Sequence, residues 1–433
     1  MRRIHSLFKL ISGAAVAGIT FAPAGHAATT VRPQFPVWAA DLARAICEAG
    51  RPAPLDLTTQ LQAAGKVVST SETVIDSETM LGLRFGIDEG GELQVTVRLP
   101  GAAGQRVRIT YAPPPGGNGD DLFAQTGPDC RIDLARIVER DDMGRPQTLV
   151  EYAGDKLERA TAEPLNPEVP QRPDPGGIAV ATIDTGIAYT VPQFASRLAR
   201  DSDGRILGHD FHDDDDRPFD LDPSRPAVFP IRHGTAVASI LLREAPDARL
   251  VPLRYPAGAP ERFADMVEHI AAGPARIVAM PLGGARRDEW EPFADAARRH
   301  PEILFVVSAG NDGRDIDATP IYPAAFGLGN VLVVTSTDAF GRLAAESNWG
   351  ARTVDIAVPG ERIDVVDHRG AAGKASGSSY AVPRVAALAA RMKARDPDLD
   401  AAAIKSAILG LAVPLGDASR PVAAGWIPNP AIE

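Results

Sequence analysis

This 433-residue chain contains an aspartate, a histidine and a serine whose neighbouring residues suit catalysis. Asp184 follows the mostly apolar run Val180–Ile183, His233 precedes Gly-Thr-Ala-Val-Ala-Ser, and Ser379 lies in Gly-Ser-Ser-Tyr-Ala-Val-Pro. A serine hydroxyl becomes a nucleophile when an imidazole accepts its proton, and a carboxylate can orient that imidazole. Residues of these three types can together carry out nucleophilic catalysis by a hydroxyl.

Each segment alone also has a plainer interpretation. Asp184 could cap the next element, and Ser378 or Ser379 could be an ordinary helix N-cap. Asp-Thr-Gly also occurs in aspartic proteases, which need two carboxylates sharing one proton; it occurs here once, so that chemistry would require a symmetric dimer. We expect the histidines outside these segments to be surface or structural residues: His209, His212, His269, His300 and His368.

Together the three segments resemble the subtilase family of serine proteases, whose order along the chain is Asp, His, Ser. The resemblance covers about residues 177–428. It implies a catalytic triad in which Ser379 forms an acyl-enzyme, His233 is the general base and Asp184 orients the imidazole. Further matches follow the family's order: Ser308–Asn311, Tyr322–Ala324, Ser347–Gly350 and Val354–Gly360.

The resemblance also implies an oxyanion hole and a substrate groove. The oxyanion donors would be the Asn311 side chain and the backbone N–H of Ser379. Met280–Gly284 resembles the Ser-Leu-Gly-Gly segment that lines the family's first specificity pocket, and Ser308–Gly310 would form the opposite wall. Protein or peptide substrates would lie extended between these walls. The residues expected to bind substrate are Leu282, Gly283, Gly284, Ser308, Ala309 and Gly310.

Some residues depart from the family pattern. Pro281 replaces a serine and has no backbone N–H to pair with a substrate. Ser378 and Tyr380 replace the Thr and Met that flank the serine, Arg232 replaces a Gly, and Val358 replaces an Ala. No catalytic group is removed. These departures support a second hypothesis, a catalytically silent binding protein with a protease fold.

The elements around these motifs predict a doubly wound α/β domain, a parallel sheet covered by helices on both faces, and the resemblance implies that this domain is subtilisin-like. Active sites of such sheets lie at the carboxyl ends of the strands. The expected strands are 178–183, 250–255, 276–282, 303–308 and 331–335. The expected helices are 234–244, 262–272, 288–299, 380–394 and 399–411.

The N-terminal part has another pattern. A helix is predicted at 36–49, and alternating apolar residues at 81–87, 93–99 and 107–111 predict a smaller, mainly antiparallel β domain. The proline-rich segment 162–177 is predicted to be a linker, which gives a β domain at 28–161 and a peptidase domain at 178–433. Since subtilases are commonly made with a pro-region, the β domain is either an intramolecular inhibitor and folding chaperone or a permanent accessory domain.

Composition limits the partners and the compartment. The net charge of −11 argues against nucleic acid as a partner. Residues 1–27 contain a basic stretch, an apolar run and a small-residue site, the three parts of a signal peptide. We therefore expect an exported protein, periplasmic or secreted. No later apolar run is long enough to span a membrane.

In an oxidising compartment, Cys47 and Cys130 predict one disulfide, with two buried thiols as the alternative.

An acidic run, His212–Asp216, lies between the first two triad positions, with Asp210, Asp220 and Asp222 nearby. No cofactor is expected to be required. Several subtilases bind calcium and carboxylates suit it, so calcium is a possible ligand, but the spacing matches no known loop. A solvated acidic loop is the favoured interpretation.

Overall fold

The structure is a computed structural model, and contacts within it divide the chain into two compact units. One comprises Met1–Leu165 with Pro226–Phe229, and the other comprises Asn166–Arg225 with Pro230–Glu433. The signal peptide predicted at 1–27 lies outside the residues that the structure describes. Those described residues are 37–49, 69–73, 80–86, 91–101, 104–112, 121–416 and 419–433.

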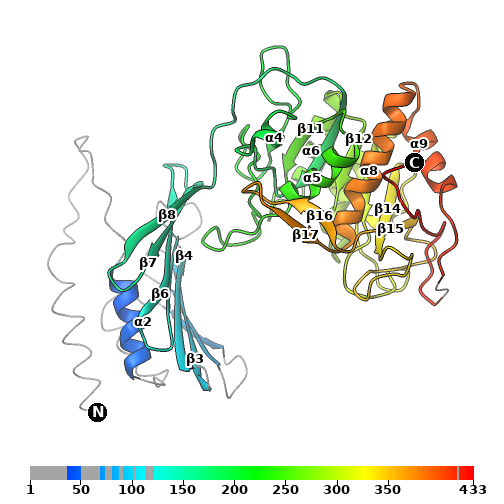
Figure 1. Cartoon of the computed structure of the whole chain (residues 1–433). Coiled ribbons are helices and arrows are strands. Elements are labelled where there is room, and N and C mark those ends of the chain that lie inside the picture. The colour runs from blue at the N-terminus through cyan, green and yellow to red at the C-terminus, as the bar shows by residue number, and fades with distance from the viewer. Residues whose placement is uncertain are drawn as a thin grey trace. The chain divides into compact units, whose positions relative to one another are not determined.

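The first unit is an antiparallel sheet in which each strand pairs with the next along the chain, with helix α2 (Val37–Ala49) packed on it (Figure 1). Val95, Val97, Val107 and Ile109 are fully buried under α2 because alternate residues of a strand point to one face. This confirms the predicted antiparallel β region. Its strands are β1 (Ser69–Thr73), β2 (Met80–Gly86), β3 (Glu92–Gly101), β4 (Gly104–Ala112), β5 (Asp121–Thr126), β6 (Ile132–Arg140), β7 (Pro146–Ala153) and β8 (Glu158–Pro164).

A disulfide joins Cys47 of α2 to Cys130, two residues before β6 begins. The two Cα atoms are 5.5 Å apart, within the usual range for a disulfide, and the bond spans 83 residues of sequence. The predicted pairing is therefore confirmed over the alternative of two thiols. It ties the helix to the sheet on which it packs.

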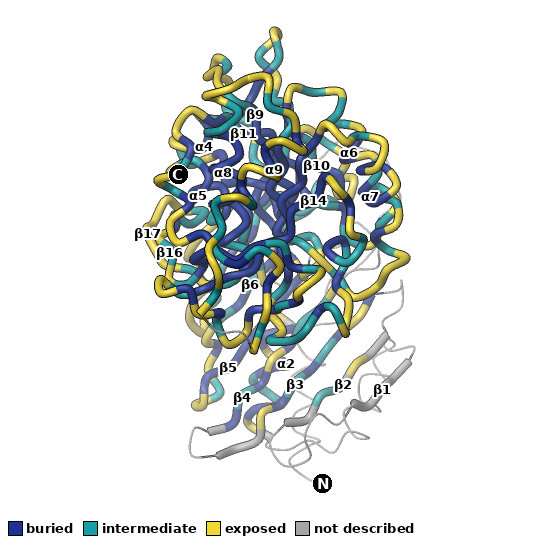
Figure 2. Tube along the Cα trace, turned by 90° about the vertical axis from the view of Figure 1, so that its right-hand side faces the viewer, coloured by how far each residue is buried: buried dark blue, intermediate teal, exposed yellow. Residues whose placement is uncertain are grey.

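The second unit is built on a parallel sheet with the strand order β10-β11-β9-β12-β13-β14-β15. Every neighbouring pair in this sheet is parallel, which confirms the predicted fold class. Figure 2 shows buried residues concentrated along its strands. The strands are β9 (Ile178–Asp184), β10 (His209–Asp210), β11 (Ala248–Arg254), β12 (Ile277–Met280), β13 (Leu304–Ser308), β14 (Val331–Thr337) and β15 (Ile356–Pro359).

Helices cover both faces of the parallel sheet. Within β9, Ala181 and Ile183 join one core with α6 and α7, whereas Val180 joins the other core with α5, α8 and α9. Strands that are apolar on both faces require such cover, as the sequence indicates. The helices are α4 (Pro192–Ala195), α5 (Gly234–Glu244), α6 (Arg262–Ala272), α7 (Arg287–Arg299), α8 (Ser378–Arg395) and α9 (Ala401–Gly410), with a 3-10 turn at Ala324–Phe326 and a hairpin of β16 (Ile363–Val366) and β17 (Ala372–Ala375).

The predicted linker is partly in the first sheet, because β8 extends to Pro164. The linker bounds and the domain limits drawn from them stay predictions. Among the described residues, no helix is both long enough and apolar enough to cross a membrane.

Candidate active site

Asp184 is the last residue of β9, which lies inside the sheet between β11 and β12. Its side chain is only 1% exposed. One carboxylate oxygen, Oδ1, accepts a hydrogen bond of 2.7 Å from the backbone N–H of Thr185. The sheet thus fixes a buried negative charge at the carboxyl end of a central strand, where ligands of such folds bind.

His233 immediately precedes helix α5, and its imidazole is hydrogen-bonded to Asp184. The Nδ1 atom lies 2.8 Å from Oδ1 and 2.9 Å from Oδ2 of that carboxylate. The next residue, Gly234, has no room for a side chain, because a Cβ atom there would collide with the carbonyl oxygen of Gly186. The small residue lets α5 start against the turn that follows Asp184, so the imidazole meets the carboxylate.

The electrostatic surroundings of His233 favour its charged form. Burial lowers the pKa of the imidazole, but the charge and the hydrogen bond of Asp184 outweigh it, and Asp220 and Asp222 add to the effect. Together they raise the pKa of His233 to about 8. The ring is still 24% exposed, so a substrate or solvent can reach it.

Two adjacent serines begin helix α8, and they have different surroundings. Ser378 is fully buried, and its hydroxyl lies 2.7 Å from the hydroxyl of Ser308. The Ser378 hydroxyl and backbone N–H also donate to Oδ1 of Asn311, at 3.0 and 2.9 Å. Ser379 is only partly buried. Of the two, Ser379 is therefore the one that a substrate can reach.

Asn311 is oriented by these bonds. Because its Oδ1 accepts from Ser378, the two amide hydrogens on Nδ2 are left for a ligand. Gly377, the N-cap of α8, has a φ of 125° that favours glycine, and a Cβ atom there would lie 3.1 Å from the same oxygen. Ser379 is the second residue of α8, so its N–H has no acceptor within the helix.

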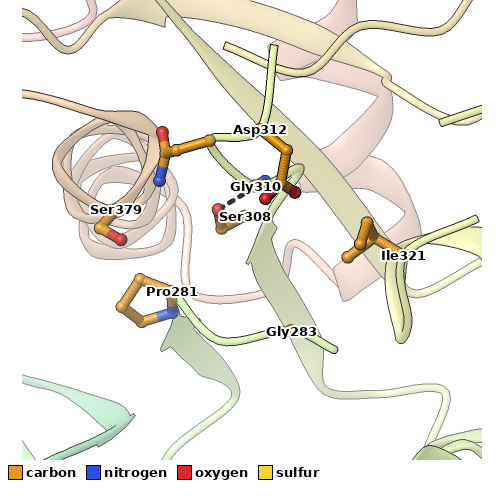
Figure 3. Close-up of a pocket in the computed structure, with 8 residues that line it drawn as sticks. Pro281, Gly283, Ser308, Gly310, Asp312, Ile321 and Ser379 are labelled. Atoms are coloured by element: carbon orange, nitrogen blue, oxygen red, sulfur yellow. Dashed lines mark hydrogen bonds between the residues drawn. The ribbon is translucent and has the colours of Figure 1, made fainter. Parts of the chain in front are cut away.

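Asn311 and Ser379 share one pocket of about 320 Å³. Figure 3 shows Ser379 and Pro281 on one side of this pocket and Ile321 on the other. Of the residues expected to bind substrate, Gly283, Ser308 and Gly310 line it, whereas Leu282, Gly284 and Ala309 do not. The lining residues are Pro281, Gly283, Ser308, Gly310, Asn311, Asp312, Ile321 and Ser379.

The three residues do not yet form a continuous chain of hydrogen bonds. Among the hydrogen bonds of the described residues, none joins His233 to Ser379. The ring of Tyr380 lies next to the imidazole, with the two ring centroids 5.6 Å apart. Catalytic hydrogen bonds are often long or poorly aligned until substrate binds, so a triad is compatible with this arrangement.

These residues lie in a part of the chain that matches a known protein family. Residues 176–426 match the model of the family described as "Subtilase family". The chain belongs to the subtilase family. The matched region begins just before β9 and includes Asp184, His233, Asn311 and Ser379.

Individual subtilases are similar to this one over about half of its length. The thermophilic serine proteinase of Bacillus sp. (strain AK1) is 32% identical over 230 residues, which cover 49% of this chain and 51% of that protein. Thermitase of Thermoactinomyces vulgaris is 26% identical over 227 residues, 49% of this chain and 74% of thermitase. The chain thus spans about half the length of the first relative. A solved cold adapted subtilisin-like serine proteinase matches with 23% identity and a TM-score of 0.49, covering 61% of this chain and 93% of that one.

The acidic run of this subtilase is paired with cations. Asp210 and Asp213 both contact Nη1 of Arg254 at 2.7 Å, and Asp214 contacts Arg262 at 2.6 Å. These carboxylates already pair with the guanidinium groups of Arg254 and Arg262, which take the place that a calcium ion would need. Among the described residues, no group of three or more His, Cys, Asp or Glu side chains is arranged to hold a metal.

Sequence reasoning missed several residues of this subtilase site. Asp312 and Ile321 line the pocket, but neither belongs to a motif that the resemblance singled out. Asp220 was noted only as part of an acidic stretch, although it is fully buried beside His233. The position of Asp312, directly after Asn311, was the only available signal for that residue.

Proposed function

We propose that this subtilase is an exported serine endopeptidase that hydrolyses peptide bonds through an acyl-enzyme on Ser379. Two observations carry the proposal: the buried Asp184 carboxylate is bonded to Nδ1 of His233, and Ser379 and Asn311 line one pocket. Nucleophile, base, orienting acid and oxyanion donor would then come from the starts of α8 and α5, the end of β9 and the loop after β13.

The proposed reaction begins with proton transfer. Because Asp184 holds the proton on Nδ1, the Nε2 atom of His233 has a free lone pair and can accept the proton of the Ser379 hydroxyl. The Ser379 oxygen attacks the peptide carbonyl carbon, and the imidazolium then gives its proton to the leaving amine. Water hydrolyses the acyl-enzyme by the same steps and restores the hydroxyl.

The attack converts the peptide carbonyl into an oxyanion, which needs donors already in place. Nδ2 of Asn311 and the N–H of Ser379 supply them, and the latter also lies at the positive end of α8. No step requires a metal or an organic cofactor. The pocket between Pro281, Gly283 and Ile321 would hold the side chain that precedes the cleaved bond.

Labelling with a fluorophosphonate tests the proposal, because this probe reacts with an activated serine. The full chain should be labelled, Ser379→Ala should not, and His233→Ala should react far more slowly. Ser376→Ala, an exposed serine three positions earlier, is the matched control and should be labelled as the parent is.

The alternative, a silent binding protein, is favoured by one observation, the missing hydrogen bond between Ser379 and His233. It predicts a folded chain that neither reacts with the probe nor cleaves peptides. A peptide library would separate the two functions, because a silent protein retains peptides without cutting them. Cleavage that disappears in Ser379→Ala excludes the silent protein.

For the β region at 28–161, we propose a pro-region that aids folding and is cut within 162–177. The support is its separation as a compact unit and the proline-rich segment that follows. Export is supported by the signal-like residues 1–27 and by the Cys47–Cys130 disulfide. Mass spectrometry of active enzyme decides the first point: a chain that still begins at Ala28 shows a permanent accessory domain instead.

A further inference from the structure

A second buried carboxylate, Asp220, lies beside the His233–Asp184 pair, and the chemistry above does not use it. Asp220 is 0% exposed and belongs to the loop between β10 and α5. Its Oδ1 accepts a hydrogen bond of 3.1 Å from the backbone N–H of His233, and its Oδ2 accepts one of 3.0 Å from Thr235. The carboxylate thus holds the backbone on both sides of Gly234.

Thr185 connects this carboxylate to the residue after Asp184. The Thr185 hydroxyl donates to Oδ1 of Asp220 at 2.5 Å and accepts from the N–H groups of His233 and Gly234, at 3.2 and 2.8 Å. The hydroxyl can make all three contacts only because Asp220 takes its single proton. One network therefore joins the end of β9 to the start of α5, the two points that bear Asp184 and His233.

The charge of Asp220 also reaches the imidazole. Groups that face His233 come from several elements: Asp184 at the end of β9, Asp220 and Asp222 from the loop, and Tyr380 from α8. Arg232 precedes the histidine and donates to the carbonyl oxygen of Asp220. Burial and the charges of Asp184 and Asp220 raise the pKa of the Tyr380 hydroxyl, so this phenol adds no charge near neutral pH.

We propose that Asp220 is a positioning residue for His233, which fixes the backbone that presents the imidazole to Asp184 and adds a negative charge that favours the imidazolium. The proposal rests on His233 being the general base. A helix cap would explain the bond to Thr235 by itself. It does not explain the bond to the His233 N–H, the shared hydroxyl of Thr185 or the burial of a charge beside another carboxylate.

Titration of the His233 ring by NMR tests this without relying on activity. The sample is the full chain with isotope-labelled histidine and Ser379→Ala to prevent self-cleavage, and the His233 signal is assigned with His233→Gln. In Asp220→Asn the imidazole pKa should fall from about 8 by about half a pH unit or more, because a charge that raises it is gone.

Asp222→Asn is the matched control, since this carboxylate is two residues away but binds Tyr255 and Ser224 and not the His233 backbone. Its effect on the imidazole pKa should be clearly smaller. A folded Asp220→Asn chain with the parent's imidazole pKa, or an equal fall in Asp222→Asn, overturns the proposal.

Kinetics on chains with Ser379 intact give the second measurement. Asp220→Asn should lower kcat about ten-fold with little change in KM, and the acid limb of the pH profile should move to lower pH.

If Asp220→Asn does not fold, Thr185→Val tests the same network and Thr185→Ser should restore kcat. Parent values of kcat and imidazole pKa in folded Thr185→Val contradict the role. If no chain, the parent included, cleaves peptides but Asp220→Asn still lowers the imidazole pKa, the proposed enzyme function is refuted. The positioning role of Asp220 is then retained.

Discussion

Nδ1 of His233 lies almost equally far from the two carboxylate oxygens of Asp184, 2.8 Å from Oδ1 and 2.9 Å from Oδ2. Both contacts are made by one ring nitrogen, so the carboxylate favours the proton on Nδ1 and leaves the lone pair on Nε2, the atom that accepts the proton in the proposed mechanism. The carboxylate is buried, and Thr185 donates to the same Oδ1. The orientation of the imidazole therefore depends on the charge of Asp184.

Replacing Asp184 by Asn should retain the fold and lower kcat by about 10⁴-fold, because the amide favours the wrong tautomer of the imidazole. The measurement is kcat for a peptide substrate, with circular dichroism to show that the variant folds. Asp222→Asn serves as the control for a lost nearby charge. A loss of less than about ten-fold in a folded Asp184→Asn chain would contradict the assigned role.

The pH profile should follow the His233 imidazole. Its pKa is raised to about 8, so below that pH the ring is protonated and cannot act as a base. The value of kcat/KM should therefore rise with pH and reach half its plateau near pH 8. Measurement from pH 5 to 10 with one peptide checks this, and a plateau already complete at pH 6 would mean that another group limits the rate.

Sequence patterns predicted the second unit well and the first only in part. Strands such as β9 and β13 are buried on both faces and are bounded by clear helices, so their type and position were confirmed. Strands β5 to β8 were not predicted. Their sequences lack a sustained alternation: the apolar residues of β5 and β7 are adjacent, as in Leu149–Val150, and β8 is mostly exposed and polar.

The residues of the site that sequence could identify are those carried by short motifs at strand ends and helix starts. Asp184 and His233 belong to such motifs, and the structure brings them into hydrogen-bond contact. Asp220 could not be recognised, because it lies 13 residues before His233 in an irregular loop whose path no periodicity specifies. Ile321 reaches the pocket only through a long connection after β13.

Removal of the disulfide should weaken the first unit. The bond closes a loop of 83 residues between Cys47 and Cys130, and chain entropy predicts a loss of about 4 to 5 kcal/mol in its free energy of unfolding. Urea unfolding of Cys47→Ser, followed by circular dichroism, measures it in the Ser379→Ala background. The double variant with Cys130→Ser should be equally unstable. A single variant as stable as the parent would show that the bond constrains the unfolded chain little.

The amide of Asn311 should matter to the transition state and not to the fold. Its Oδ1 is bound by Ser378, which aims Nδ2 into the pocket that holds Ser379. Asn311→Ala should lower kcat by about 10² to 10³-fold, about 2.7 to 4 kcal/mol, a range that comes from the corresponding amide of a subtilisin. KM should change little, because the oxyanion forms only after attack.

Asp312→Ala is the matched control for Asn311→Ala. Asp312 is the next residue and lines the same pocket, but its carboxylate cannot donate to an oxyanion. Its replacement should alter KM and the preference for the substrate side chain more than kcat. Equal losses of kcat in the two variants would mean that the loop after β13 acts by its shape, and Asn311 would lose its role as a specific donor.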